Sequence, residues 1–82
     1  MAESFTGTVN TNNEFVTVEN ATGVTFTSGN TYTIQIKDFC TLKLYDAEFD
    51  LDHEKLQYKA GGEDLYIKTS SLGCGIAILE EE

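Results

Sequence analysis

Apolar and polar residues alternate with a period of two along most of the chain, whereas helical periodicity is nearly absent. The clearest alternation covers residues 31–37, where Tyr32, Ile34 and Ile36 share one face. The parity of the apolar positions then slips, which predicts a bulge or tight turn near Tyr45 and Asp46. The whole pattern predicts short strands near residues 4–9, 14–19, 24–27, 31–37, 40–44, 47–51, 55–59, 65–69 and 76–79.

Clusters of Gly, Asn and Ser interrupt the alternation about every 8–12 residues, as turns do between short strands. The main clusters fall at residues 10–13, 28–30, 60–64 and 70–75. A chain of 82 residues has room for one hydrophobic core. We therefore expect a single domain over residues 1–82, with an all-β fold of about eight short strands. Both a small antiparallel β-barrel and a β-sandwich fit this pattern, because each hides its sheet edges.

The charge balance narrows the function classes. Five Lys and no Arg oppose fourteen Asp and Glu, which gives a net charge of −9. A binder of nucleic-acid backbones needs a positive surface, so we expect no nucleic-acid partner. No apolar run approaches the ~20 residues that cross a bilayer, so we expect no membrane partner. Glu3 stands where a signal peptide would carry basic residues, and we expect synthesis in the cytoplasm.

An acidic run is the most distinctive local feature. Carboxylates occupy every second position at Asp46, Glu48, Asp50, Asp52 and Glu54. On a strand these five would line one face, while Phe49 and Leu51 would enter the core. The run suits a solvated strand face, a basic protein partner or a hard cation such as Ca²⁺. The glycine and glutamate of an EF-hand loop are missing, and ligands along a straight strand do not converge, so we assign no metal site.

Candidate catalytic chemistry is sparse. His53 is the only imidazole and has no nucleophile motif beside it, so we interpret it as a surface residue in a turn. Cys40 and Cys74 fit two structural thiols, a conditional disulfide or, with His53, a thin metal site. Gly73 and Gly75 could present the second thiol in an exposed turn or simply form the turn. We expect neither an enzyme nor a cofactor.

The distribution of charge hints at assembly. Charges are few in residues 4–13 and 20–36, where Thr and Ser dominate the positions outside the core. Interface cores are depleted of charge, so this surface could contact another subunit, although a neutral solvent face fits equally well. The candidate subunit contacts are Thr25, Thr27, Thr31, Thr33 and Gln35.

Two segments carry a resemblance to a known group of proteins. They are Gly29–Ile36 (GNTYTIQI) and, after Tyr58, the turn and strand Ala60–Thr69 (AGGEDLYIKT). Together they resemble small all-β proteins encoded among the structural genes of bacteriophages and prophages. The resemblance implies a virion component, such as a capsid decoration protein or a head or tail accessory subunit. Such a protein would bind copies of itself, with a trimer as one form, and phage capsid or tail proteins. It would reside in the virion, and in the host cytoplasm during assembly.

Two other function classes stay open from the sequence. The acidic run could mimic phosphates in a small phage-encoded inhibitor of a host nucleic-acid-binding defence protein. Charge reversal at Asp50 and Asp52 would then abolish partner binding. A Ca²⁺-dependent binding module would instead show a melting temperature that rises with Ca²⁺.

Overall fold

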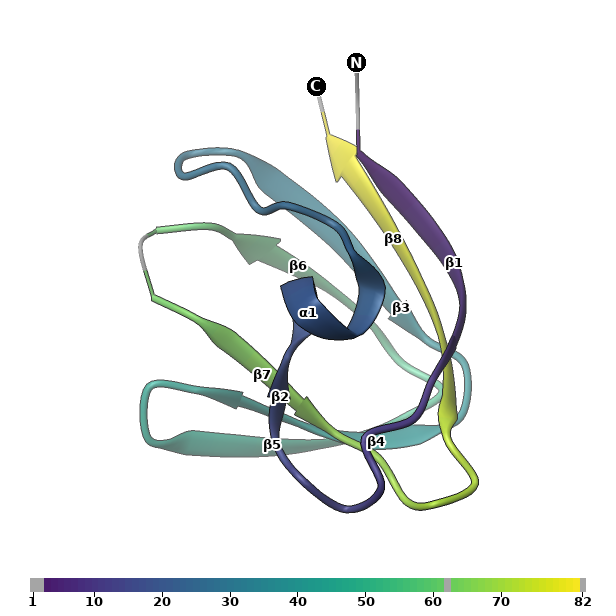
Figure 1. Ribbon diagram of the computed structural model, residues 1–82. Coiled ribbons are helices and arrows are strands. Elements are labelled where there is room, and N and C mark those ends of the chain that lie inside the picture. The colour runs from purple at the N-terminus through teal and green to yellow at the C-terminus, as the bar shows by residue number, and fades with distance from the viewer. Residues whose placement is uncertain (1–2, 62, 82) are drawn as a thin grey trace.

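The computed structural model describes residues 3–61 and 63–81. In this part of the chain, eight strands form two four-stranded sheets, called sheet A and sheet B (Figure 1). In spatial order, sheet A consists of β1 (Ser4–Val9), β8 (Cys74–Glu81), β3 (Thr31–Ile36) and β6 (Lys55–Lys59). Sheet B consists of β2 (Val16–Thr17), β7 (Leu65–Lys68), β4 (Phe39–Leu44) and β5 (Ala47–Asp52), and the helix α1 spans Val18–Thr22.

Neighbouring strands are antiparallel throughout both sheets. The sheets pack as two layers and do not close into one barrel. The predicted all-β class is therefore confirmed, and the structure decides in favour of a sandwich. The turn predicted near Tyr45 and Asp46 is also confirmed, because these two residues join β4 to β5 with Leu44 opposite Ala47.

One long, bent hairpin links the two sheets. Its first arm runs through β3 and β4 and its second arm runs back through β5 and β6, so each arm contributes a strand to both sheets. At the bends, the backbone N–H of Ile36 donates to the carbonyl of Glu54 over 2.6 Å, and that of His53 donates to Asp38 over 2.8 Å. His53 has a φ of 53°, which bends the second arm. The two sheets thus meet at this corner.

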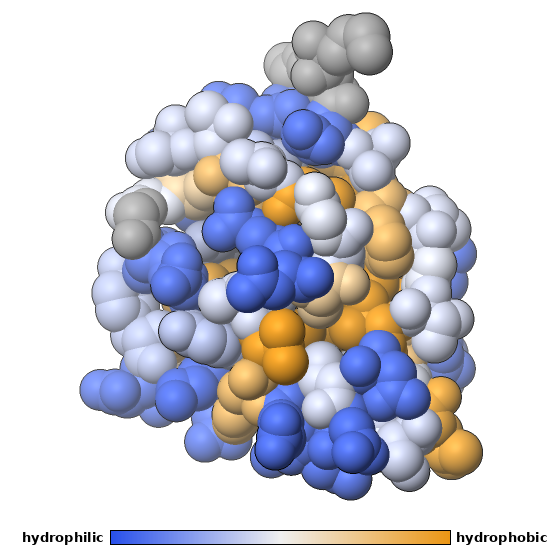
Figure 2. Space-filling view, viewed as in Figure 1, coloured by the Kyte–Doolittle hydropathy of each residue, from blue (hydrophilic) through white to orange (hydrophobic). Residues whose placement is uncertain are grey.

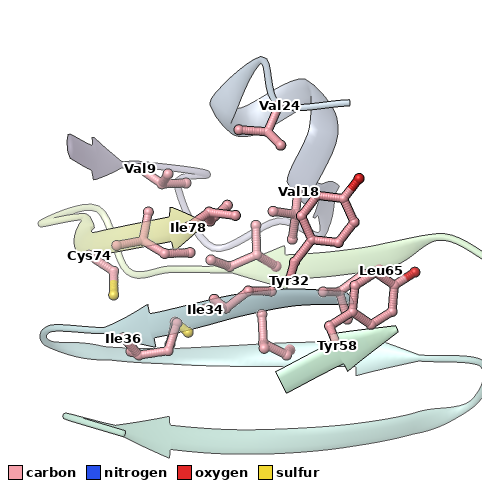
Figure 3. Packing of buried hydrophobic residues seen from close by; sticks show 14 of the residues in the cluster. Val9, Val18, Val24, Tyr32, Ile34, Ile36, Tyr58, Leu65, Cys74 and Ile78 are labelled. Atoms are coloured by element: carbon pink, nitrogen blue, oxygen red, sulfur yellow. The ribbon is translucent and has the colours of Figure 1, made fainter. Parts of the chain in front are cut away.

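The core lies between the sheets and is built from the alternating apolar residues of both inner faces (Figure 3). Tyr32, Ile34 and Ile36 of β3 are fully buried there, as the alternation predicts. The ring of Phe26 meets the Tyr32 ring edge to face at 4.7 Å and the Tyr58 ring at 5.2 Å. Aromatic packing therefore fills one end of the sandwich.

The predicted strand over residues 14–19 is wrong. Only Val16 and Thr17 pair with β7, and the chain then turns into α1. The Thr17 side chain caps the helix by accepting from the N–H of Asn20, and Gly23 ends it with a φ of 82°. Local capping outweighed the alternation here. The sequence carried a signal for this short helix: a capping residue, Thr17, at its start and a glycine, Gly23, directly after its end.

The predicted strand over residues 24–27 is also wrong, since this segment pairs with no strand of the described chain. The alternation of this segment nevertheless identifies its buried side chains correctly, because Val24 is 3% exposed and Phe26 packs on the core. The Tyr32 hydroxyl replaces a strand partner by accepting from the N–H of Thr27 over 2.6 Å. An alternating segment can therefore cover the end of a sandwich without joining a sheet.

Candidate interaction surfaces

Each sheet ends in two edge strands, and their outward backbone groups differ in the side chains beside them. Hydrogen bonds to the neighbouring strand occur at every second residue, and the residues between direct their N–H and C=O outward. The bond from Glu80 N–H to the Glu3 carbonyl fixes this parity for β1. The bonds at His53 and Ile36 fix it for β5 and β6. The residues whose backbone N–H and C=O point away from the sheet edge are Ser4, Thr6 and Thr8 on β1, Glu48, Asp50 and Asp52 on β5, and Lys55, Gln57 and Lys59 on β6.

The acidic run occupies the edge of sheet B. Glu48, Asp50 and Asp52 share one side of β5 as predicted, whereas Asp46 lies in the preceding turn and Glu54 in the bend. Thr41 Oγ1 donates to Asp50 Oδ1 over 2.8 Å, and Glu48 lies opposite Lys43. These carboxylates are exposed and form a row along the strand edge.

The prediction that Phe49 enters the core is wrong. Phe49 is on the inner side of β5 but remains 49% exposed, and Leu51 is half-buried. The reason is that β5 is an edge strand, so only β4 covers it within its sheet. Sequence alternation gives the direction of a side chain, whereas edge position decides how much of it is covered.

An apolar cleft of about 310 Å³ opens between β5 and β6, on the inner side of the bent hairpin. Apart from Gln57, its lining is apolar or aromatic. The lining residues are Leu42, Leu44, Phe49, Leu51, Leu56, Gln57, Tyr58 and Leu65. The opposite side of the sandwich is closed by α1, which contacts β1, β2 and β7 (Figure 1). The core is therefore open on the β5–β6 side.

The outer face of sheet A is a broad surface of small, mostly uncharged side chains. A shallow hollow of about 330 Å³ lies on it, with Ala77 of β8 at the level of Thr6 and Gln35 on the flanking strands. Leu79 on the same face is 54% exposed, and Lys55 stands at one end. Figure 2 views the flank over β1, which is mostly pale, in contrast to the strongly hydrophilic lower margin near the β4–β5 side.

The structure divides the predicted subunit contacts into two groups. Thr31, Thr33 and Gln35 alternate on β3 and lie on the outer face of sheet A. Thr25 and Thr27 instead belong to the loop bound to the Tyr32 hydroxyl, whose ring points into the core. They therefore lie away from that face, because the loop covers the end of the sandwich rather than forming a strand.

Cys40 and Cys74 are both buried and both free. Burial, together with the neighbouring Cys74 thiol, raises the pKa of Cys40 to about 12. Burial also raises the pKa of Cys74. Of the two interpretations of Gly73 and Gly75, the turn that exposes a thiol is excluded, since Cys74 is fully buried at the start of β8. Each thiol packs as a small apolar side chain.

His53 lies on the surface at the bend, where Nδ1 contacts the Asp52 carboxylate, and its side chain is 70% exposed. Within residues 3–61 and 63–81, no three His, Cys, Asp or Glu side chains gather closely enough to hold a metal ion. No helix in the described chain is both long and apolar enough to cross a bilayer.

One carboxylate inside the fold, that of Glu80, is not among the residues that the sequence pattern singled out. Glu80 of β8 is only 9% exposed, and its carboxylate accepts from the N–H of Glu3 and from the Asn30 amide, over 2.9 and 2.6 Å. The Tyr32 hydroxyl lies 3.2 Å from the same carboxylate. These donors, the Glu3 N–H first, hold the pKa of Glu80 below its ordinary value. The sequence carried a signal for this burial, because Glu80 continues the alternation of Ile76 and Ile78, which point into the core.

Lys55 and Lys59 were overlooked as well. They alternate on β6 as the acidic residues alternate on β5, but the bend at His53 changes the parity between the two runs.

Comparison with protein-family models, with curated proteins and with solved structures finds no match for this chain. Its surfaces therefore have to be interpreted from their own chemistry.

Proposed function

We propose that this chain is a structural subunit of a bacteriophage virion, a capsid decoration protein or a head or tail accessory protein, which acts by protein–protein assembly. The observation that carries this proposal is the outer face of sheet A. In a chain with a net charge of −9, this four-stranded face has a hollow around Ala77, an exposed Leu79 and few charges. Among these charges are the lysines of β6 and Glu81 at the end of β8, whose carboxylate accepts from Thr33 and Gln57. Depletion of charge at the centre is typical of interface cores. The virion setting comes from the resemblance of the two segments described above.

The hollow suggests how such a contact would form. Its floor is low because the small residue Ala77 lies on the outer face of β8, between the longer side chains of Thr6 on β1 and Gln35 on β3. A side chain from a capsid or tail protein would fill the hollow, while the hydroxyl of Thr6 supplies a hydrogen bond at one side. The Thr33 hydroxyl already donates to Glu81 over 2.8 Å, so it could only accept from the partner. Sheet A would thus face the virion lattice, and the acidic β5 edge would face away from it.

Mass spectrometry of purified particles of the parent phage tests this proposal. We expect the chain in wild-type particles and its loss from particles carrying Ala77→Lys, which places a charge in the hollow. Ser71→Lys, in an exposed loop, is the matched control and should be retained. Wild-type particles that lack the chain would rule out the virion role. Equal retention of both variants would rule out this face as the contact.

The exposed row on β5 favours a second candidate, the acidic inhibitor of a basic host protein. Glu48, Asp50 and Asp52 repeat at the ~6.8 Å step of alternate strand residues, and no strand of the described residues covers their edge. Here the chain would bind a basic host protein more weakly as salt rises, and Asp50→Lys with Asp52→Lys would abolish binding. The virion role predicts that these two substitutions leave the chain in the particle.

A further inference from the structure

The acidic edge and the lysine edge form one continuous surface. β5 and β6 are consecutive in the chain, separated only by the bend at His53 and Glu54, and each is the outermost strand of its sheet. The apolar cleft lies between their inner sides. Unpaired backbone groups, two rows of opposite charge and exposed apolar side chains are therefore present on one side of the molecule.

This surface is complementary to itself. A two-fold axis through the bend, perpendicular to the hairpin, would run β5 of one copy antiparallel to β6 of the other. Asp52 would then lie opposite Lys55 of the other copy, and Glu48 opposite its Lys59. Asp50 would face Gln57 in the same register. In this register, the outward-directed backbone groups of β5 meet those of β6, so both strands gain a complete ladder.

The same register matches the inner side chains. It places Leu51 opposite Leu56 and Phe49 opposite Tyr58, and all four line the cleft. Directly opposed residues of an antiparallel pair point to the same face, so these side chains would extend both cores across the axis. The bend is preserved, because a two-fold axis perpendicular to the hairpin makes both copies curve to the same side.

We propose that two copies of this chain pair through their β5–β6 edges, so that each covers the apolar cleft of the other and the sandwich becomes continuous across the dimer. Sheet A of one copy would continue into sheet B of its partner. This pairing deepens the assembly role proposed above. It rests on one part of that role, self-association, and not on contact with a virion. The lattice contact on the outer face of sheet A stays free.

Charge complementarity selects a second copy as the occupant. A row of carboxylates on an edge strand repels most strands, and a row of lysines likewise prevents indiscriminate pairing. Along the hairpin, the acidic row on β5 comes before the lysine row on β6. In an antiparallel copy of the hairpin, the lysine row lies opposite the acidic row and the acidic row lies opposite the lysine row. A second copy also brings an apolar surface identical to the exposed one, as a two-fold interface requires.

Absolute mass from size exclusion with light scattering tests the pairing. We expect the wild type at twice the chain mass. Lys55→Glu with Lys59→Glu should run as a monomer, because carboxylates would then face carboxylates. Glu48→Lys with Asp52→Lys should also run as a monomer. Lys37→Glu with Lys68→Glu changes the net charge as the first pair does but lies off this edge, and it should remain a dimer.

Mixing the Lys55→Glu, Lys59→Glu variant with the Glu48→Lys, Asp52→Lys variant tests the charge pairing most directly. In a mixed pair, every altered residue again faces an opposite charge, so an equimolar mixture should recover the dimer mass. A chain carrying all four substitutions has the net charge of the wild type and should dimerise by itself. Circular dichroism checks that each variant is folded. If one pair does not fold, the four-fold variant and the off-edge control still decide.

A wild type that is a monomer or a trimer would overturn the pairing, as would a dimer that survives Lys55→Glu with Lys59→Glu. Loss of the dimer in the off-edge control, or failure of the mixture to recover it, would show that the effect is non-specific and would also overturn it. These outcomes are separable from the virion role, which depends on Ala77 and is measured in particles. A monomeric chain found in virions would leave the proposed function standing.

Discussion

The two sides of the sandwich manage their strand edges differently. On β1, the residues whose backbone N–H and C=O point away from the sheet are Ser4, Thr6 and Thr8, and the adjoining side of the core is closed by α1. On β5 and β6 the corresponding residues are charged or amide-bearing, and the core between them is open. The comparison shows that charge gathers where the apolar interior is least covered. Charged residues on an edge strand restrict which strand can pair with it.

The largest expected effect compares a central strand with an edge strand. Ile34 lies at the centre of sheet A and is fully buried, whereas Phe5 on β1 is half-buried. Ile34→Ala should lower the free energy of unfolding by about 3 kcal/mol, since it leaves a cavity between the sheets. Phe5→Ala should cost about half of that. Urea unfolding followed by circular dichroism measures both, and equal losses would contradict a core centred on β3.

A smaller effect compares the buried carboxylate of Glu80 in sheet A with an exposed carboxylate of the acidic run. Because the folded-state pKa of Glu80 lies below its ordinary value of 4.5, its stabilisation is present above that pH. It is lost as the pH falls through the lower, folded-state value. Glu80→Gln should therefore melt below the wild type at pH 7, and the difference should shrink as the solution is acidified below 4.5. Asp46→Asn, in the exposed turn, serves as the control. A difference between Glu80→Gln and wild type that is independent of pH would contradict the role given to the carboxylate.

A still smaller effect concerns the uncharged edge. Thr6→Lys adds a charge to β1 at an exposed position whose backbone groups point outward. It should change the free energy of unfolding by less than about 0.5 kcal/mol and leave the mass in solution unchanged. Chemical denaturation and light scattering check the two quantities. A change in mass would show that β1, and not the β5–β6 side, mediates self-association.

The smallest expected effect is that of Ca²⁺ on the acidic edge. Glu48, Asp50 and Asp52 are spaced along a strand, so their oxygens do not converge on one ion. Adding Ca²⁺ should leave the melting temperature unchanged in differential scanning fluorimetry. A rise that a chelator reverses would instead support the Ca²⁺-dependent module.

Local sequence determined much of this protein. The alternation gave the inner and outer residues of β3, and the parity slip gave the turn at Tyr45 and Asp46. Both follow from the two-residue period of a strand, which needs no knowledge of partners. The same reasoning erred at residues 14–19 and 24–27, where capping of α1 and the Tyr32 hydroxyl provided hydrogen bonds that alternation does not reveal.

Only the tertiary structure decided which strands became edges. Phe49 and Ile34 follow similar alternating patterns, yet one is half exposed and the other fully buried, because β5 ends its sheet and β3 lies inside one. Likewise, the chain order places Asp52 and Lys55 three residues apart, but the bend between them aligns both along one outer edge. Strand order is set by pairing between distant residues, so the cleft and its two charged rows emerged only once the hairpin had folded over the core.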